Sequence, residues 1–402
     1  MASEVLSDEV LSSLVDFIIR PPRAEYLPND LGPHLFTIRN TVVQRTDIEL
    51  LNHRNLTLHA SIYEPQSTPV LALRNTQIDH LPYVIYCHGN GSCRMEAESI
   101  VKLLTCYGVG VFAMDFSGSG MSQGEFISLG VYEKYDIQVA VEYLRVHRNA
   151  KNIALWGHSM GAATVLMYAG MSNNNQNETE KLACIIVDSA YASFDKLAET
   201  LVHQMGLPVA VPKRIVLTVG VRFVKKSVKE RAGFSLDDVN PVASGKKCSR
   251  IPAIFLHGLA DDVVTPNHSE IILKAYACTN KALITEPELM HESPRPLWML
   301  TRCAIFVVEH LYDNWNEFYA CAKALANDAL FETRYEDAVH AYSRIIERGE
   351  IEYSSVQGSL RSHNIAKPNV MRQSAPVVSN SMTESQKGAA SSTTKKNPNV
   401  AK

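Results

Sequence analysis

A serine flanked by two glycines is the feature of this 402-residue sequence that most directly suggests chemistry. It follows a short apolar run and opens a helical stretch, the context expected for a nucleophile elbow. That turn from strand into helix is too sharp for side chains at either glycine, and it projects the serine hydroxyl outward. We predict Ser159 as the nucleophile and the main-chain N–H of Met160, at a helix N-terminus, as an oxyanion donor. The segment is Gly157-His158-Ser159-Met160-Gly161.

A second glycine-rich segment lies earlier in the chain, directly after an apolar run at 82–87. Glycines let main-chain N–H groups approach a reacting carbonyl closely, and such groups stabilise an oxyanion. We therefore predict the N–H of Asn90 as the second oxyanion donor. The segment is His88-Gly89-Asn90-Gly91.

A serine hydroxyl is a weak nucleophile that needs a base, and the base needs an acid to orient it. For an elbow of this kind the chain order is serine, acid, histidine. His291 follows the last apolar run and is the predicted base. Asp261 and Asp262 follow the preceding run and are the main candidates for the acid. Asp188, after an earlier run, is a less favoured candidate. Each of these residues directly follows an apolar run that could form a strand. In a parallel β-sheet, functional residues lie at the carboxyl ends of the strands.

The elements that must position these residues alternate between short apolar runs and helical stretches from about 81 to 312. The runs are rich in β-branched and aromatic residues, as strands covered on both faces should be. Repeated strand–helix units predict an α/β fold with a parallel sheet. Residues 36–63 alternate apolar and polar types, which predicts an antiparallel edge hairpin. The predicted strands are 82–87, 109–114, 152–156, 182–187, 251–256 and 281–285, with helices at 95–107, 132–146 and 160–170.

Two regions depart from this alternation. About fifty residues at 201–250 separate two strands, which predicts a helical lid inserted over the sheet. The tail at 354–402 has ten serines, no aromatic residue, and seven Lys or Arg against one Glu, so we expect it to be disordered and basic. The predicted organisation is an N-terminal helix with an extended lead-in at 1–35, a core at 36–200 and 251–315 interrupted by the lid, a C-terminal helical hairpin at 316–353, and the tail.

These motifs together resemble the α/β-hydrolases. Within that fold they resemble eukaryotic serine hydrolases related to serine aminopeptidases and to monoacylglycerol-lipase-type and depalmitoylase-type enzymes. In such families HG-x-x-D-x-x-V carries the acid at its first aspartate, which implies Asp261 here. The usual Gly and Asn around the catalytic histidine are replaced by Met290 and Glu292. The segments that carry the resemblance are HGNG (88–91), DFSGSGMSQGEF (115–126), GHSMG (157–161), VDSAYASF (187–194), HGLADDVV (257–264) and HESPRP (291–296).

The resemblance implies hydrolysis without a metal or organic cofactor. From it and from the apolar lid stretch, we expect carboxylic esters or thioesters of hydrophobic acyl groups as substrates, either small molecules or lipids. A serine peptidase or aminopeptidase on the same residues is an alternative. A catalytically silent binding or scaffold protein that keeps the fold is another.

Composition and the cysteine and N-terminal patterns argue against several other classes of function. A net charge of −3 argues against a nucleic-acid partner. The eight cysteines form no CxxC pair, which disfavours a zinc ribbon or a redox site. The N-terminus lacks the basic and apolar regions of a signal peptide, so we expect a cytoplasmic protein. The basic and apolar stretch at 212–229 is a candidate for peripheral contact with anionic membranes.

Two segments near the C-terminus are candidates for protein partners. Residues 322–347 resemble half of a tetratricopeptide unit, and one such unit cannot bury a stable solenoid face. A helical hairpin packed on the catalytic domain is therefore expected there. Residues 372–376, in the sequence RQSAP, match a phosphorylation site that a basic docking protein could recognise.

Overall fold

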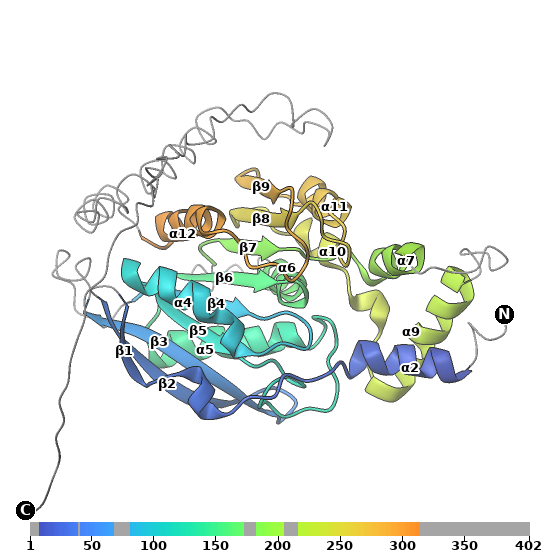
Figure 1. Ribbon diagram of the computed structural model, residues 1–402, viewed down its shortest axis with the longest axis horizontal. Coiled ribbons are helices and arrows are strands. Elements are labelled where there is room, and N and C mark those ends of the chain that lie inside the picture. Colours follow the sequence, from blue (N-terminus) through green and yellow to red (C-terminus); the bar gives the residue numbers. More distant parts are fainter. Residues whose placement is uncertain (1–7, 39–40, 68–80, 173–181, 205–215, 313–402) are drawn as a thin grey trace, which may run out of the picture. The chain divides into compact units, whose positions relative to one another are not determined.

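The computed structural model describes residues 8–38, 41–67, 81–172, 182–204 and 216–312 (Figure 1). The chain divides into two units, Met1–Ile351 and Glu352–Lys402. Every residue of the second unit lies outside the described ranges. The predicted hairpin at 316–353 and the tail at 354–402 also lie outside them, as does the candidate site at 372–376.

A mostly parallel sheet forms the centre of the described part, in the order β1-β2-β3-β5-β4-β6-β7-β8-β9. The strands from β4 onward run parallel, whereas β1, β2 and β3 are antiparallel to their neighbours. The predicted parallel strands and the edge hairpin are both confirmed, and β1 extends the hairpin by one strand. The strands are β1 (Leu35–Ile38), β2 (Thr41–Leu51), β3 (Thr57–Ser67), β4 (Tyr83–Cys87), β5 (Gly110–Met114), β6 (Ile153–His158), β7 (Ile185–Asp188), β8 (Ala253–Gly258) and β9 (Lys281–Glu286).

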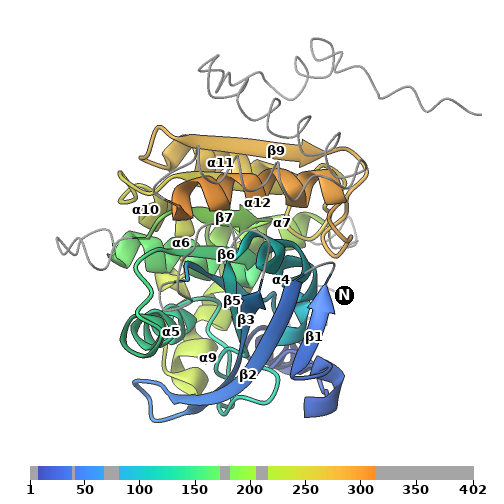
Figure 2. The same ribbon diagram turned by 90° about the vertical axis from the view of Figure 1, so that its left-hand side faces the viewer.

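Helices cover both faces of this sheet (Figures 1 and 2). Alternate residues of each central strand point to opposite faces. Thus Ile85 packs in the core that includes α5 and α6, while Val84 packs in the core that includes α4 and α12. The helices are α2 (Asp8–Ile19), α4 (Glu98–Leu104), α5 (Glu133–His147), α6 (Met160–Ser172), α7 (Phe194–Gln204), α9 (Val221–Ala232), α10 (Pro241–Gly245), α11 (Asn267–Ala275) and α12 (Leu297–Leu311).

The helix expected at 95–107 is divided into three pieces. A 3₁₀ turn at Arg94–Ala97 leads into α4, and a second at Thr105–Tyr107 follows it. Gly108 then ends the segment in the left-handed region, with a φ of 75°. A left-handed residue cannot continue a right-handed helix, and glycine adopts this conformation without a Cβ penalty.

The described residues of the insertion, 201–204 and 216–250, are mostly helical. They include the end of α7, a π-helical turn at Val216–Gly220, α9, a 3₁₀ turn at Leu236–Asp238, and α10. Helix α9 lies beside α2 (Figure 1), and Val224 and Val228 of α9 are buried in the same core as Val15 of α2. Lys225 of α9 pairs with Asp195 and Asp237. A lid role and membrane contact for this region remain predictions.

Candidate active site

The predicted nucleophile elbow is present between β6 and α6. Ser159 has a φ of 51°, a left-handed conformation that is strained for a residue with a Cβ. A Cβ added at Gly157 would lie 2.5 Å from the main chain of Gly161. One added at Gly161 would lie 2.0 Å from the Cys87 carbonyl oxygen of β4. The turn therefore leaves no room for a side chain at either glycine.

Three residues from distant parts of the sequence meet at the elbow. His291 Nε2 lies 2.8 Å from Ser159 Oγ, and His291 Nδ1 lies 2.7 Å from Asp261 Oδ2. All three side chains are buried. They follow β6, β8 and β9, whose carboxyl ends share one edge of the sheet. This is the serine–histidine–acid geometry in which a base is hydrogen-bonded to the nucleophile and oriented by a carboxylate.

Hydrogen bonds hold Asp261 in its ionised form. The other carboxylate oxygen, Oδ1, accepts the main-chain N–H groups of Val263 and Val264, at 3.0 and 2.8 Å. Burial alone would raise the pKa of this carboxyl, but hydrogen bonds from His257 and His291 outweigh it and keep the pKa well below its ordinary value. Asp261 is therefore an anion throughout the physiological range and can stabilise a His291 imidazolium.

The two alternative acids are placed elsewhere. Asp262 has an exposed side chain on the outer side of the same loop. Asp188, at the end of β7, is buried and makes a bidentate pair with Arg295, with both N–O distances 2.8 Å. The acid that contacts His291 is Asp261.

Arg295 also holds the loop that carries His291. Its guanidinium donates to the carbonyl oxygens of Met290, His291 and Ser293. The hydroxyl of Ser293 accepts the Met290 N–H at 3.0 Å, which tightens the turn further. Sequence reasoning did not single out Arg295, although the segment HESPRP contains it.

The predicted oxyanion donors follow neighbouring strands. Cys87 of β4 is in register with Gly157 of β6, so the glycine-rich loop and the elbow leave the sheet side by side. Met160 is the first residue of α6, so its main-chain N–H lies at a helix N-terminus. The oxyanion role of the Asn90 and Met160 N–H groups stays a prediction.

The glycine-rich loop is anchored at both ends. His88 is fully buried, and its Nε2 accepts the Phe116 N–H at 3.1 Å. The N–H of Gly89 donates to Glu96, a residue that the sequence did not single out because no motif spacing marks it. The lead-in contributes as well, since Ala24 donates its N–H to the Gly91 carbonyl.

Asp115 is part of the floor beneath this loop. Its carboxylate accepts the N–H groups of Arg94 and Met121, at 2.7 and 2.9 Å, and the Tyr26 hydroxyl at 2.5 Å. It is fully buried, and a Cβ at Gly120 would collide with it. Asp115 therefore organises the loop after β5. These hydrogen bonds do not involve Ser159, His291 or Asp261.

Comparison with known proteins agrees with this fold. Residues 79–216, which include the elbow and the glycine-rich loop, match the model of the family described as serine aminopeptidase, S33. The esterase Pf2001 of Pyrococcus furiosus has a similar structure, with a TM-score of 0.51 and 19% identity over 73% of this chain and 100% of that one. This likeness shows the α/β-hydrolase fold, and residues 79–216 resemble the S33 family. The predicted fold class is confirmed.

The curated relatives of this chain are distant. It is 29% identical to YqkD of Bacillus subtilis over 46% of its own length and 57% of that protein. It is 29% identical to YfhR of Escherichia coli O157:H7 over 52% of its own length and 62% of that protein. Both relatives are uncharacterized, and the chain spans less than two thirds of each.

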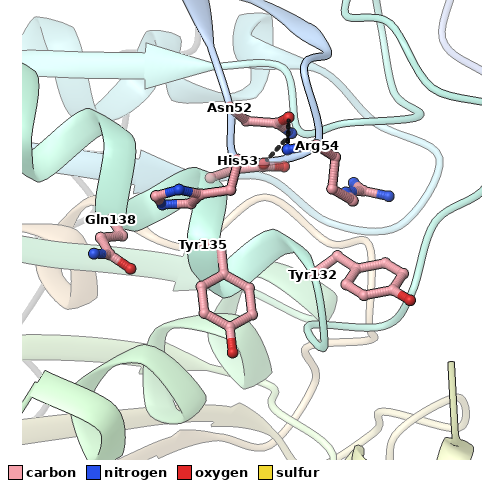
Figure 3. Close-up of a pocket in the computed structure, with 7 residues that line it drawn as sticks. Asn52, His53, Arg54, Tyr132, Tyr135 and Gln138 are labelled. Carbon is pink, nitrogen blue, oxygen red and sulfur yellow. Dashed lines mark hydrogen bonds between the residues drawn. The ribbon is translucent and has the colours of Figure 1, made fainter.

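A further hollow of about 300 Å³ lies where the β2–β3 turn meets the start of α5 (Figure 3). None of the predicted site residues lines it. Its lining residues are Asn52, His53, Arg54, Tyr132, Tyr135, Asp136 and Gln138.

In the described residues, no helix combines the length and apolar character needed to cross a bilayer.

Proposed function

We propose that this protein is a serine hydrolase that cleaves carboxylic esters or thioesters of hydrophobic acyl groups. The observation that carries the proposal is the continuous relay from Ser159 through His291 to Asp261, with hydrogen-bond lengths of 2.8 and 2.7 Å. The S33 family match over 79–216 supports the coarser conclusion that the protein is a hydrolase.

The reaction runs in two stages. Ser159 Oγ attacks the acyl carbonyl while His291 Nε2 takes its proton, and Asp261 stabilises the imidazolium that forms. The main-chain N–H groups of Asn90 and Met160 receive the developing oxyanion. His291 then passes the proton to the leaving alcohol or thiol, and the acyl group remains on Ser159. A water molecule, deprotonated by His291, attacks this acyl-enzyme. The bond from Ser159 Oγ to the acyl carbon then breaks, His291 returns the proton to Ser159 Oγ, and the acid is released.

Exposed apolar side chains support a hydrophobic acyl group. Four of them lie on or directly after the two loops that carry Asp261 and His291. Large apolar side chains exposed near a site are typical of surfaces that receive apolar ligands. They are Val263, Met290, Leu297 and Trp298, which are between 42% and 52% exposed.

The test is labelling with a fluorophosphonate probe, followed by hydrolysis of a matched panel of esters, thioesters and amino-acyl amides. We expect labelling of the wild type, loss of labelling in Ser159→Ala and a sharp fall in His291→Ala. We expect turnover of esters or thioesters that increases with acyl length. A folded wild-type protein that is not labelled would contradict the proposal and favour the silent binding protein.

A second candidate, an aminopeptidase, is favoured by one residue. The Glu292 carboxylate lies 4.0 Å from His291 Nε2 and its side chain is 84% exposed. A carboxylate at this position could bind the ammonium group of a peptide N-terminus. Cleavage of amino-acyl amides alone, lost in Glu292→Gln while labelling persists, would replace the esterase proposal with this one.

A further inference from the structure

The Glu96 carboxylate connects three elements around the candidate active site. Its Oε2 accepts the N–H of Gly89 in the glycine-rich loop, at 3.1 Å. Its Oε1 accepts the hydroxyl of Tyr86 on β4 at 2.9 Å and faces His158 Nδ1 of the elbow at 3.1 Å. A carboxylate that accepts several hydrogen bonds is strongly oriented.

His158, between Gly157 and the nucleophile, extends this network to the catalytic histidine. Its Nε2 lies 3.3 Å from the main-chain carbonyl oxygen of His291. Its ring lies 5.3 Å from the His291 ring, tilted by 35°. Both nitrogens of His158 therefore face acceptors, a carboxylate and a carbonyl. Only the doubly protonated imidazolium can donate to both.

The charges around His158 favour that protonated form. Burial would lower the pKa of the imidazole and the nearby Arg295 also lowers it, but the hydrogen bond to Glu96 and the charges of Asp188 and Glu96 raise the pKa to about 9. For Glu96, burial would raise the pKa, yet the contact with His158 lowers it to about 2. The two residues form an ion pair across the pH range in which the protein would work.

The glycine-rich loop packs directly against this pair. A Cβ added at Gly89 would lie 3.2 Å from His158 Nδ1 and 3.7 Å from Glu96 Oε2. The loop that carries Asn90 thus rests on the ion pair as well as being hydrogen-bonded to it. A shift of either side chain would move the oxyanion donor relative to Ser159.

We propose that the Glu96–His158 ion pair is a positioning pair that holds the oxyanion loop, the elbow and the His291 loop in one geometry. The inference rests on the proposed hydrolase function and adds two residues to it that touch no substrate. Glu96 sets the position of the loop through Gly89. His158 transmits the same constraint to the main chain of His291. Because displacement of about 1 Å can cost roughly 100-fold in rate, the pair acts on turnover rather than on binding.

The test compares Glu96→Gln, His158→Gln and the double variant with the wild type on the best substrate of the panel. Active sites are titrated with the fluorophosphonate probe, so kcat refers only to folded, reactive protein. We expect kcat to fall roughly 10- to 100-fold in each single variant, with KM changed less than about threefold. The kcat of the double variant should be no lower than that of the less active single variant, because the two residues act as a unit.

Glu98→Gln is the matched control. It removes the same charge two residues away, where Glu98 pairs with Lys102 on the surface of α4. We expect it to keep the wild-type kcat. A second readout does not depend on turnover. In ¹⁵N NMR the His158 ring should stay protonated toward pH 9 in the wild type, and lose its proton at least about one pH unit lower in Glu96→Gln.

The outcomes separate the two proposals. An active wild type whose Glu96→Gln variant keeps kcat within about twofold overturns the positioning role and leaves the hydrolase function standing. A wild type that is neither labelled nor active overturns the hydrolase function, and the positioning role with it. Additive losses in the double variant would overturn the view of the two residues as one unit.

Discussion

Asp261 is the residue whose chemistry the relay depends on most closely. It orients His291 and is the anion that balances the imidazolium. In Asp261→Asn the amide keeps the shape, but its NH₂ group can face His291 Nδ1, which disfavours the tautomer that accepts the Ser159 proton. We expect kcat to fall about 10⁴-fold with little change in melting temperature. Steady-state kinetics on the best ester of the panel, with thermal unfolding alongside, measures both.

Asp262→Asn is the control for this change, because it alters the same loop by the same amide on an exposed side chain. It should keep kcat within about twofold. A large loss in Asp262→Asn with a small one in Asp261→Asn would mean that the relay is not the one used in solution.

The elbow is the element whose geometry admits least change. A methyl group at Gly161 would lie 2.0 Å from the Cys87 carbonyl, and main chain cannot move aside as a flexible side chain can. We expect Gly161→Ala to lower the free energy of unfolding by about 3 kcal/mol and to abolish fluorophosphonate labelling. Urea unfolding and the labelling assay measure the two effects.

Gly245→Ala, at the end of α10, provides the comparison for this prediction. Its Cβ would meet the Tyr276 ring at 3.3 Å, and the glycine is not in the left-handed region. A change within about 1 kcal/mol and normal labelling are expected. Equal destabilisation by the two substitutions would contradict the argument from the elbow.

The loop between β9 and α12 depends on the buried pair of Asp188 and Arg295. Arg295→Met would leave the Asp188 carboxylate buried without its partner, at a cost of about 3–5 kcal/mol. The double variant Asp188→Asn/Arg295→Met removes that unpaired charge, so most of the stability should return. The loop carbonyls would still lack their donor, and kcat should stay roughly 10- to 100-fold low.

Chemical unfolding and kinetics on the wild type and both variants separate these effects. Recovery of kcat together with stability in the double variant would show that Arg295 does not position His291.

The sheet and the elbow turn were predictable because each leaves a local trace in the sequence. The choice of Asp261 over Asp262 and Asp188 came from the family resemblance. A buried parallel strand such as 82–87 is an unbroken apolar run. The elbow needs glycines at 157 and 161. The supporting residues were not predictable. Glu96 and Arg295 act through main-chain atoms of Gly89 and His291, and any residue can supply such atoms. Their partners are therefore set by the tertiary fold alone.

At the scale of the whole molecule, the candidate active site is built from segments spread over most of the described chain. The lead-in contacts the glycine-rich loop, and Tyr26 contacts Asp115 after β5. The elbow follows β6, and Asp261 and His291 follow the last two strands. A site assembled from segments so far apart in sequence should be lost cooperatively, so the ion pair at its centre should influence global stability.

The last prediction concerns the pH dependence of that stability. The folded-state pKa of Glu96, about 2, is lowered from its ordinary value of 4.5, so its stabilisation is present above pH 4.5 and lost as pH falls toward 2. The folded-state pKa of His158, about 9, is raised from 6.5, so its stabilisation is present below pH 6.5 and lost as pH rises through 9.

The difference in unfolding free energy between wild type and Glu96→Gln should therefore be largest between pH 4.5 and 6.5. It should reach about 2 kcal/mol, less than either shift implies, because both shifts report one ion pair. Urea unfolding of both proteins from pH 3 to 10 measures the difference, in which titrations common to both proteins cancel. A difference that stays constant across this range would mean that the pair is not charged in the folded protein.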